Sequence, residues 1–346
     1  MNAPRAVRAR RQMMNAKRTV KSFPSLLAAA FAAIALQVTG AAAQAQPVAA
    51  RPVRIIVPFL GGSVDDSVAR VVVKKLGETA RQPFAVENHP GDDAHFGAER
   101  AAKTDPDGYT LLFAPITNYA AAAASARGTL HYDLLADFTP VTLIANAPHV
   151  LIAHPSLRVN SVAALIAAEK ARPGLIPWAS PGTGSLSRLE LEMFAMLSGI
   201  GMIRVPFTDA DAVLPELLVG NVGVLFDNIA ATLPHIKEGR MRALAVAGST
   251  RSPALPGVPT VAASGVAGFE ADRWYAMLAP EGVEAPVVSR LNDNFAKALD
   301  AGDVRAGLLP FGFEARRSTP AELAAILRND VARWARVIKA SGLNVR

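Results

Sequence analysis

The residues that could carry out catalysis in this 346-residue chain do not form a recognisable catalytic set. None of the six histidines has metal-ligand spacing to another histidine or to a carboxylate on a predicted helix, and the chain has no cysteine. Ser185 lies in the glycine-rich segment 182–186, which lacks the G-x-S-x-G spacing of a nucleophile elbow. No lysine follows that segment, so a phosphate-binding P-loop is also excluded. Asp65 and Asp66 stand at a predicted helix start, where carboxylates usually act as caps. We therefore predict no catalytic residue, no metal site and no cofactor.

Two turns rich in glycine and serine carry a different kind of chemistry. Gly61-Gly62-Ser63 and the segment 180–185 each follow a predicted strand and precede a predicted helix. Such turns present free backbone N–H groups and hydroxyls beside the positive end of a helix, which suits a carboxylate. In open α/β sheets, ligands bind in the crevice beyond these strand ends. The pattern fits equally well a tight turn in which glycine and serine serve only the backbone.

The elements that position these turns alternate between short apolar strands and helices. The pattern predicts an α/β protein with mainly parallel sheets. One predicted helix has Leu189, Met193, Met196 and Leu197 on its buried face. Another runs from a capping box at 319–322 to about residue 340, and Gly342 ends it. The predicted strands are 53–57, 84–87, 109–113, 149–153, 176–179, 203–205, 222–226 and 242–247.

The first 45 residues have the layout of a secretory signal peptide. Seven basic and no acidic side chains precede an apolar run at 23–36, and Ala43-Gln44-Ala45 predicts cleavage after Ala45. The apolar run is too short to span a membrane. Because seven of the 36 basic residues belong to this leader, the other 29 balance the 29 acidic residues. The pI of 9.9 is therefore no sign of nucleic-acid binding, and we predict a monomeric periplasmic protein.

An ordered series of motifs resembles a known family. The series comprises VPFLGGSVDDSVAR at 57–70, VENHPG at 86–91, DPDGYTLL at 105–112, DFTPV at 137–141, RSPALPGVPT at 251–260 and WARVIK at 334–339. This series resembles the Bug family of extracytoplasmic solute receptors, the binding components of tripartite tricarboxylate transporters. The resemblance implies a type II periplasmic-binding-protein fold with two α/β lobes and a ligand cleft between them. It places lobe 1 at 46–147 and 273–346, and lobe 2 at 148–272, with crossings near 149–153 and 274–278.

The resemblance also implies the function and a set of ligand-binding residues. We expect a receptor that binds a small carboxylate or amino acid and presents it to integral-membrane transporter subunits. The alternatives are a sensor that docks on a signalling domain, and a hydrolase on the same scaffold. For Asp227 a purely structural role is the alternative. The positions that match the family site are Phe59, Leu60, Gly61, Gly62, Asp66, Pro115, Thr117, Asn118, Ser180, Gly182, Thr183, Gly184, Ser185, Ser187, Phe207, Thr208 and Asp227.

Several positions depart from the family pattern, and they bear on the identity of the ligand. Asp92-Asp93 stands where glycines are expected, Thr208-Asp209 replaces a Lys-Gly pair, and Arg188 replaces a histidine. If Asp93 or Asp209 lines the cleft, charge pairing favours a ligand that carries an amine. If both face solvent, they have no effect on the choice of ligand.

Overall fold

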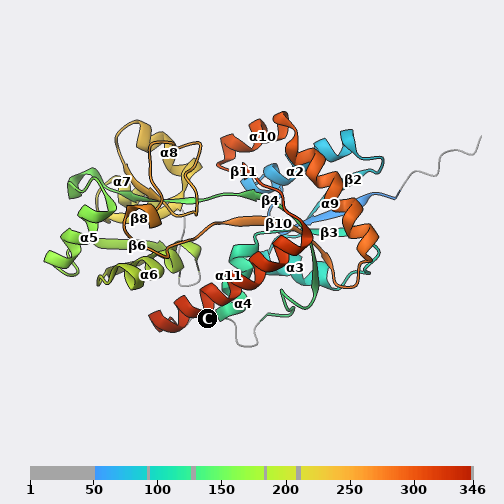
Figure 1. Ribbon diagram of the computed structural model, residues 1–346. Coiled ribbons are helices and arrows are strands. Elements are labelled where there is room, and N and C mark those ends of the chain that lie inside the picture. Colours follow the sequence, from blue (N-terminus) through green and yellow to red (C-terminus); the bar gives the residue numbers. More distant parts are fainter. Residues whose placement is uncertain (1–50, 92–93, 126–129, 183–184, 208–211, 344–346) are drawn as a thin grey trace, which may run out of the picture. The chain divides into compact units, whose positions relative to one another are not determined.

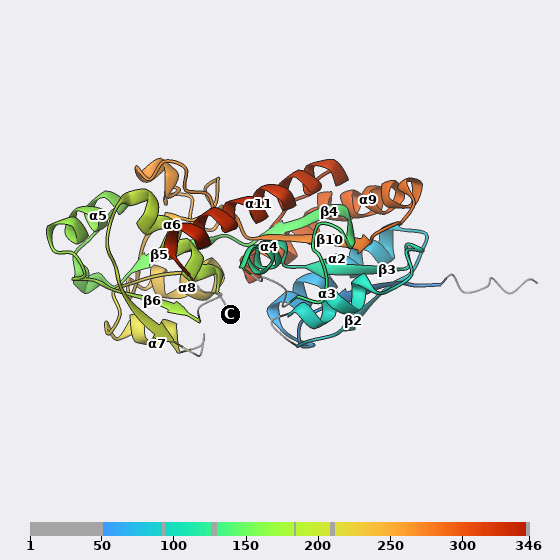
Figure 2. The same cartoon turned by 90° about the horizontal axis from the view of Figure 1, so that it is seen from below.

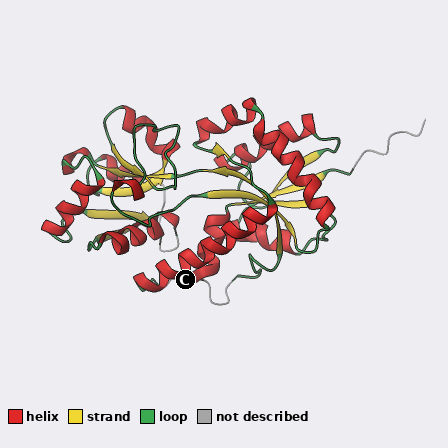
Figure 3. Ribbon diagram, viewed as in Figure 1, coloured by secondary structure: helices red, strands yellow, loops and turns green. Residues whose placement is uncertain are grey.

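The chain builds two separate β-sheets, each flanked by helices (Figures 1 and 3). This computed structural model describes residues 51–91, 94–125, 130–182, 185–207 and 212–343. The first sheet has the strand order β11-β4-β10-β3-β1-β2, and the second has the order β7-β6-β8-β5-β9. No helix in these described ranges is long and apolar enough to cross a bilayer.

The eight strands predicted from the apolar runs are confirmed with ends shifted by at most two residues, whereas β4, β10 and β11 were not predicted as strands. The first sheet contains β1 (Val53–Val57), β2 (Phe84–Asn88), β3 (Thr110–Ala114), β4 (Phe138–Asn146), β10 (Trp274–Pro280) and β11 (Glu314–Ala315). The second contains β5 (His149–Ala153), β6 (Pro177–Pro181), β7 (Ile203–Phe207), β8 (Val224–Asn228) and β9 (Arg242–Val246). β3 is fully buried, as its unbroken apolar sequence implies.

The prediction of mainly parallel sheets is wrong, because both sheets are mixed. β1 pairs parallel with β2 and β3, and β6 pairs parallel with β7 and β8. β10, however, lies antiparallel between β3 and β4, and β5 lies antiparallel between β8 and β9. Parallel pairs arise from strand–helix–strand crossovers. β4 instead continues into β5 of the other sheet after only Ala147 and Pro148, and the chain later returns to the first sheet as β10.

Two helices, α5 and α11, begin where the predicted caps place them. Ser161 caps α5 by accepting a hydrogen bond from the Ala164 N–H, and Thr319 forms the predicted capping box with Glu322. The helices beside the first sheet are α2 (Val64–Thr79), α3 (His95–Ala102), α4 (Ile116–Ser125), α9 (Ala285–Asp300), α10 (Gly302–Leu308) and α11 (Pro320–Ser341). Those beside the second are α5 (Val162–Ala171), α6 (Leu186–Ser198), α7 (Val213–Leu218) and α8 (Ile229–Lys237).

The predicted buried face of α6 is only partly correct. Leu189 and Met193 are buried, but Met196 and Leu197 are exposed. All residues from Leu186 to Phe194 are buried, including polar ones. Burial therefore changes along this helix, from a wholly buried start to an exposed last turn. A pattern that assumes a single buried face cannot capture that change.

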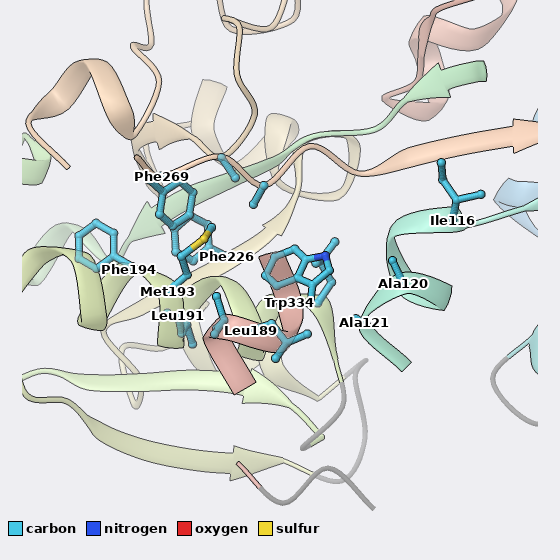
Figure 4. Close-up of a cluster of buried hydrophobic side chains, with 14 of the residues drawn as sticks. Ile116, Ala120, Ala121, Leu189, Leu191, Met193, Phe194, Phe226, Phe269 and Trp334 are labelled. Carbon is cyan, nitrogen blue, oxygen red and sulfur yellow. The ribbon is translucent and has the colours of Figure 1, made fainter. Parts of the chain in front are cut away.

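Helix α11 packs against elements of both sheets. It contacts α4 and β4 of the first sheet and α6 of the second, and both views show it running past α4 towards α6 (Figures 1 and 2). Its Trp334 is fully buried and lies beside Leu189 and Leu191 of α6 (Figure 4). An apolar core therefore joins this C-terminal helix to α6, the helix that follows the second glycine-rich turn.

The two segments that pass between the sheets are hydrogen-bonded to each other. The Ala147 N–H donates to the Arg273 carbonyl at 2.9 Å, and the Arg273 N–H donates to Asn146 Oδ1 at 3.1 Å. Asn146 Nδ2 donates to the Asp272 carboxylate at 2.6 Å. Thr117 Oγ1 accepts from the Trp274 N–H at 2.9 Å and donates to the Asp272 carbonyl at 3.2 Å. We refer to Asn146, Ala147, Asp272, Arg273 and Trp274 as the junction.

Asp330 of α11 lies against this junction and should make stability depend on pH. Its carboxylate lies 3.4 Å from Thr117 Oγ1 and accepts from Arg333, and burial raises its pKa to about 6, against the lowering effect of Arg333. Asp272 and Glu270 raise the pKa further. The unfolded chain releases this proton near pH 3.8, so stability falls by about 2 kcal/mol as the pH rises from 4 to 6.

An Asp330→Asn variant lacks this titratable group, so its stability relative to wild type should improve by about 2 kcal/mol between pH 4 and pH 7. Urea unfolding of both proteins across that range measures the difference. Asp293→Asn changes an exposed carboxylate on α9 and is the matched control. A constant difference between Asp330→Asn and wild type across the range would contradict the prediction.

Candidate ligand-binding site

A cavity of about 560 Å³ lies beside the junction and takes residues from elements of both sheets. Its volume falls in the range typical of small-molecule sites. α4 and the junction supply Asn118 and Arg273, and the second sheet and its helices supply the remaining lining residues. Those residues are His149, Ser185, Leu186, Ser187, Val213, Leu214, Pro215, Leu218, Leu225, Phe226, Asp227, Asn228, Ala231 and His235.

The N-terminus of α6 forms one part of the cavity wall. Ser185 is the N-cap, and its side chain accepts from the Arg188 N–H at 3.2 Å. Ser187 Oγ donates to the Phe226 carbonyl at 2.6 Å, which fixes the first turn of the helix against β8. The start of a 13-residue helix carries partial positive charge, so this wall favours an anion.

His149 and Asp227 form a second part of the wall, and the buried Glu190 contacts His149. His149 Nδ1 lies 2.8 Å from Glu190 Oε2, and Asp227 Oδ1 accepts from the Asn228 N–H at 2.7 Å. Burial raises the pKa of both Glu190 and Asp227, although the charges of His149 and Arg273 act to lower it. These acids therefore hold their protons more readily than they would in water. The described residues contain no set of three or more histidine and acidic side chains placed to bind a metal.

Comparison with known proteins identifies the family. Residues 68–343 match the tripartite tricarboxylate transporter family receptor, TctC. The chain belongs to this receptor family. Protein BugT of Bordetella pertussis is 34% identical to it over 297 residues, which cover 86% of this chain and 91% of BugT.

Solved structures of relatives match the receptor in fold over nearly their whole length. The R. palustris protein Rpa4515, solved with adipate, has a TM-score of 0.69 and 32% identity, covering 86% of the receptor and 99% of that chain. MatC from Rhodopseudomonas palustris, solved with bound malate, has a TM-score of 0.66 and 32% identity, covering 84% and 99%. The resemblance found in the sequence motifs is thus confirmed, together with the two-lobed periplasmic-binding-protein fold. The protein is a solute receptor of a periplasmic family and not an enzyme.

Four of the residues predicted for the site line the cavity: Asn118, Ser185, Ser187 and Asp227. Pro115, Thr117 and Ser180 are buried but do not line the cavity. Thr117 belongs to the hydrogen-bond network of the junction. The Gly182 N–H donates to the Phe207 carbonyl at 2.7 Å, which ties the second glycine-rich turn to β7. Phe207 itself is half-buried. Thr183, Gly184, Thr208, Asp92, Asp93 and Asp209 lie outside the described residues.

The predicted residues of the first turn occupy a different position. Phe59 is half-buried, whereas Leu60, Gly61 and Gly62 are exposed, and none of the four lines the cavity. Gly62 has a φ of 83°, a conformation that favours glycine. The Asp66 carboxylate holds this turn by accepting a hydrogen bond from the Gly62 N–H.

Asp66 is engaged entirely by protein donors. Its carboxylate accepts from the Gly62 N–H, Arg70 Nε and Asn88 Nδ2, each at 2.8 Å. Burial alone would raise the pKa of Asp66, but these hydrogen bonds from Arg70, Asn88 and Gly62 lower it. An ionised Asp66 therefore shapes the first turn, and its oxygens are already in use.

Most of the cavity-lining residues escaped the sequence analysis. Three ionisable residues at or beside the cavity show why: His149 and Arg273, which line it, and Glu190, which contacts His149. Each is a single charged or titratable residue inside or next to an apolar segment. No local motif marks them. Only the fold brings residues separated by 41 positions, as His149 and Glu190 are, into contact.

Proposed function

We propose that this receptor binds one small carboxylate-containing molecule in the cavity beside the junction and presents it to integral-membrane transporter subunits. The observation that carries the proposal is the capped N-terminus of α6 at the wall of a cavity of small-molecule size. Relatives at 32% identity were solved with adipate and with malate, which supports a carboxylate ligand here.

We also propose the organisation of the exported chain. Residues 1–45 are a signal peptide that is removed after Ala45, which leaves the receptor in the periplasm. Residues 46–147 and 273–346 form lobe 1, and residues 148–272 form lobe 2. The passage of the chain from β4 to β5 and its return at β10 support these boundaries. Ligand binding shifts the population towards a closed arrangement of the lobes, because only that arrangement lets both lobes contact the ligand.

Calorimetric titration of the chain from residue 46 onwards with succinate, malate, aspartate, adipate and citrate tests the proposal. We expect at least one of these acids to bind with one-to-one stoichiometry and a Kd of about 10 μM or tighter. Mass spectrometry of the acid after long incubation should show it chemically unchanged. Binding of none of the five acids, or conversion of a bound acid into a product, would contradict the proposed function.

A further inference from the structure

Arg273 is a cation at the cavity wall that has no direct counter-ion. Its Nε is buried without a hydrogen-bond partner, and within the described part of the chain its guanidinium forms no hydrogen bond and no ion pair. The side chain lies over the ring of Tyr275, with 5.2 Å between the guanidinium carbon and the ring centroid. Arg273 is partly buried, and withdrawing a cation from water without pairing it with an anion is costly, because no direct contact replaces the lost hydration.

Acidic side chains near Arg273 act on it by charge but do not pair with it. Burial alone would lower the pKa of Arg273, and Tyr275, Asp65, Glu190 and Asp227 together raise it. Asp65 Oδ1 and Glu190 Oε1 are themselves buried without a hydrogen-bond partner among the described residues. The acids thus explain why the guanidinium is tolerated at this position, although none of them forms a hydrogen bond with it in the described part of the chain.

The backbone on both sides of Arg273 is fixed by hydrogen bonds. The Arg273 N–H and carbonyl bond to Asn146 and Ala147, and the following Trp274 N–H bonds to Thr117. The preceding Asp272 carboxylate accepts from Asn146 Nδ2 and from the Ser249 N–H. The guanidinium therefore projects from a rigid base at the cavity wall, and ordering its backbone costs little when a ligand binds.

Asp227 supplies the complementary group. One of its oxygens accepts from the Asn228 N–H, and the other has no hydrogen-bond partner among the residues whose structure is described. Asp227 lines the cavity and lies within the electrostatic reach of Arg273. A carboxyl group at this point attracts a hydrogen-bond donor and repels a second carboxylate.

We propose that Arg273 binds the carboxylate of the ligand and that Asp227 accepts a hydrogen bond from a hydroxyl or amine of the same molecule. This inference rests on the proposed function and specifies its substrate class: a carboxylic acid that carries a hydrogen-bond donor. Arginine is suited to this role because its planar guanidinium forms two parallel hydrogen bonds to a carboxylate.

Titration with succinate, malate and aspartate tests the assignment, because these four-carbon acids differ in having no donor, a hydroxyl or an amine. Wild type should bind malate or aspartate at least about 10-fold more tightly than succinate, since a hydrogen bond to a charged group contributes about 1.5–3 kcal/mol. Asp227→Asn should reduce that preference to within about threefold. Whichever of malate and aspartate binds more tightly identifies the donor.

Arg273→Gln should weaken binding of the preferred acid by about 30-fold, and Arg273→Lys, which keeps the charge but loses the paired geometry, by a smaller factor. Thermal unfolding without ligand provides the structural readout. If Arg273 only balances the buried acids, Arg273→Gln will lower the Tm and leave the Kd of the folded protein unchanged, which overturns the assignment. Equal affinity of wild type for all three acids overturns the role of Asp227. Both outcomes leave the proposed function standing, whereas failure of wild type to bind any of the acids contradicts the function and the assignment together.

Discussion

Ala231→Trp is expected to weaken carboxylate binding by at least about 100-fold while the protein remains folded. Ala231 lies on α8, is exposed, and lines the cavity. An indole at this position projects from an exposed helix face, so it disturbs no packed core, but it takes up space that a ligand needs. Because the cavity volume is only about 560 Å³, we expect the indole and a four- to six-carbon acid to exclude each other.

Calorimetric titration with the tightest-binding acid measures this effect. The matched control is Ala167→Trp, which adds the same side chain at an exposed position of α5 that does not line the cavity. The control should bind as wild type does, and both variants should unfold within a few degrees of wild type. Unchanged affinity of Ala231→Trp would show that the ligand binds elsewhere.

Glu169→Ala should lower the free energy of unfolding by about 4 kcal/mol. Glu169 is 1% exposed, and its carboxylate accepts from the Gly174 and Ile176 N–H groups, each at 3.0 Å, and from Trp178 Nε1 at 3.2 Å. Removal of the carboxylate leaves these donors without their acceptor and opens a void beside the fully buried Trp178. These contacts connect α5 to β6, the strand that leads to the second glycine-rich turn.

Urea unfolding at pH 7 measures the loss of stability. Glu169→Gln keeps one acceptor oxygen and should lose roughly half as much as Glu169→Ala. Glu238→Ala, at an exposed position where the carboxylate pairs with Arg240, should change stability by less than about 1 kcal/mol. A loss below about 1 kcal/mol for Glu169→Ala would mean that water or other groups replace the carboxylate.

Much of the fold was predictable from local sequence signals. The strand at Val53–Val57, the N-cap Ser161 and the capping box at Thr319 each depend on neighbouring residues, and all three are confirmed. The mixed character of the sheets was not predictable in this way. It follows from a chain path in which β4 and β10 lie side by side although they are more than 120 residues apart.

The candidate site was predictable only where it is built from turns. The second glycine-rich turn pointed to Ser185 and Ser187, and these residues do line the cavity. Arg273 gave no signal, because a single arginine before an apolar strand resembles many surface arginines. Its importance appears only when the fold places it at the wall of the same cavity as Asp227 and leaves its Nε without a hydrogen-bond partner among the described residues.

A crystal structure of the receptor grown with its tightest-binding acid tests the central claim most directly. We predict one acid molecule in the cavity, with a carboxylate contacting the N-terminal turn of α6 at Ser185 and lying within hydrogen-bonding distance of Arg273. An acid bound elsewhere, with this cavity filled only by water or by the protein's own side chains, would contradict it.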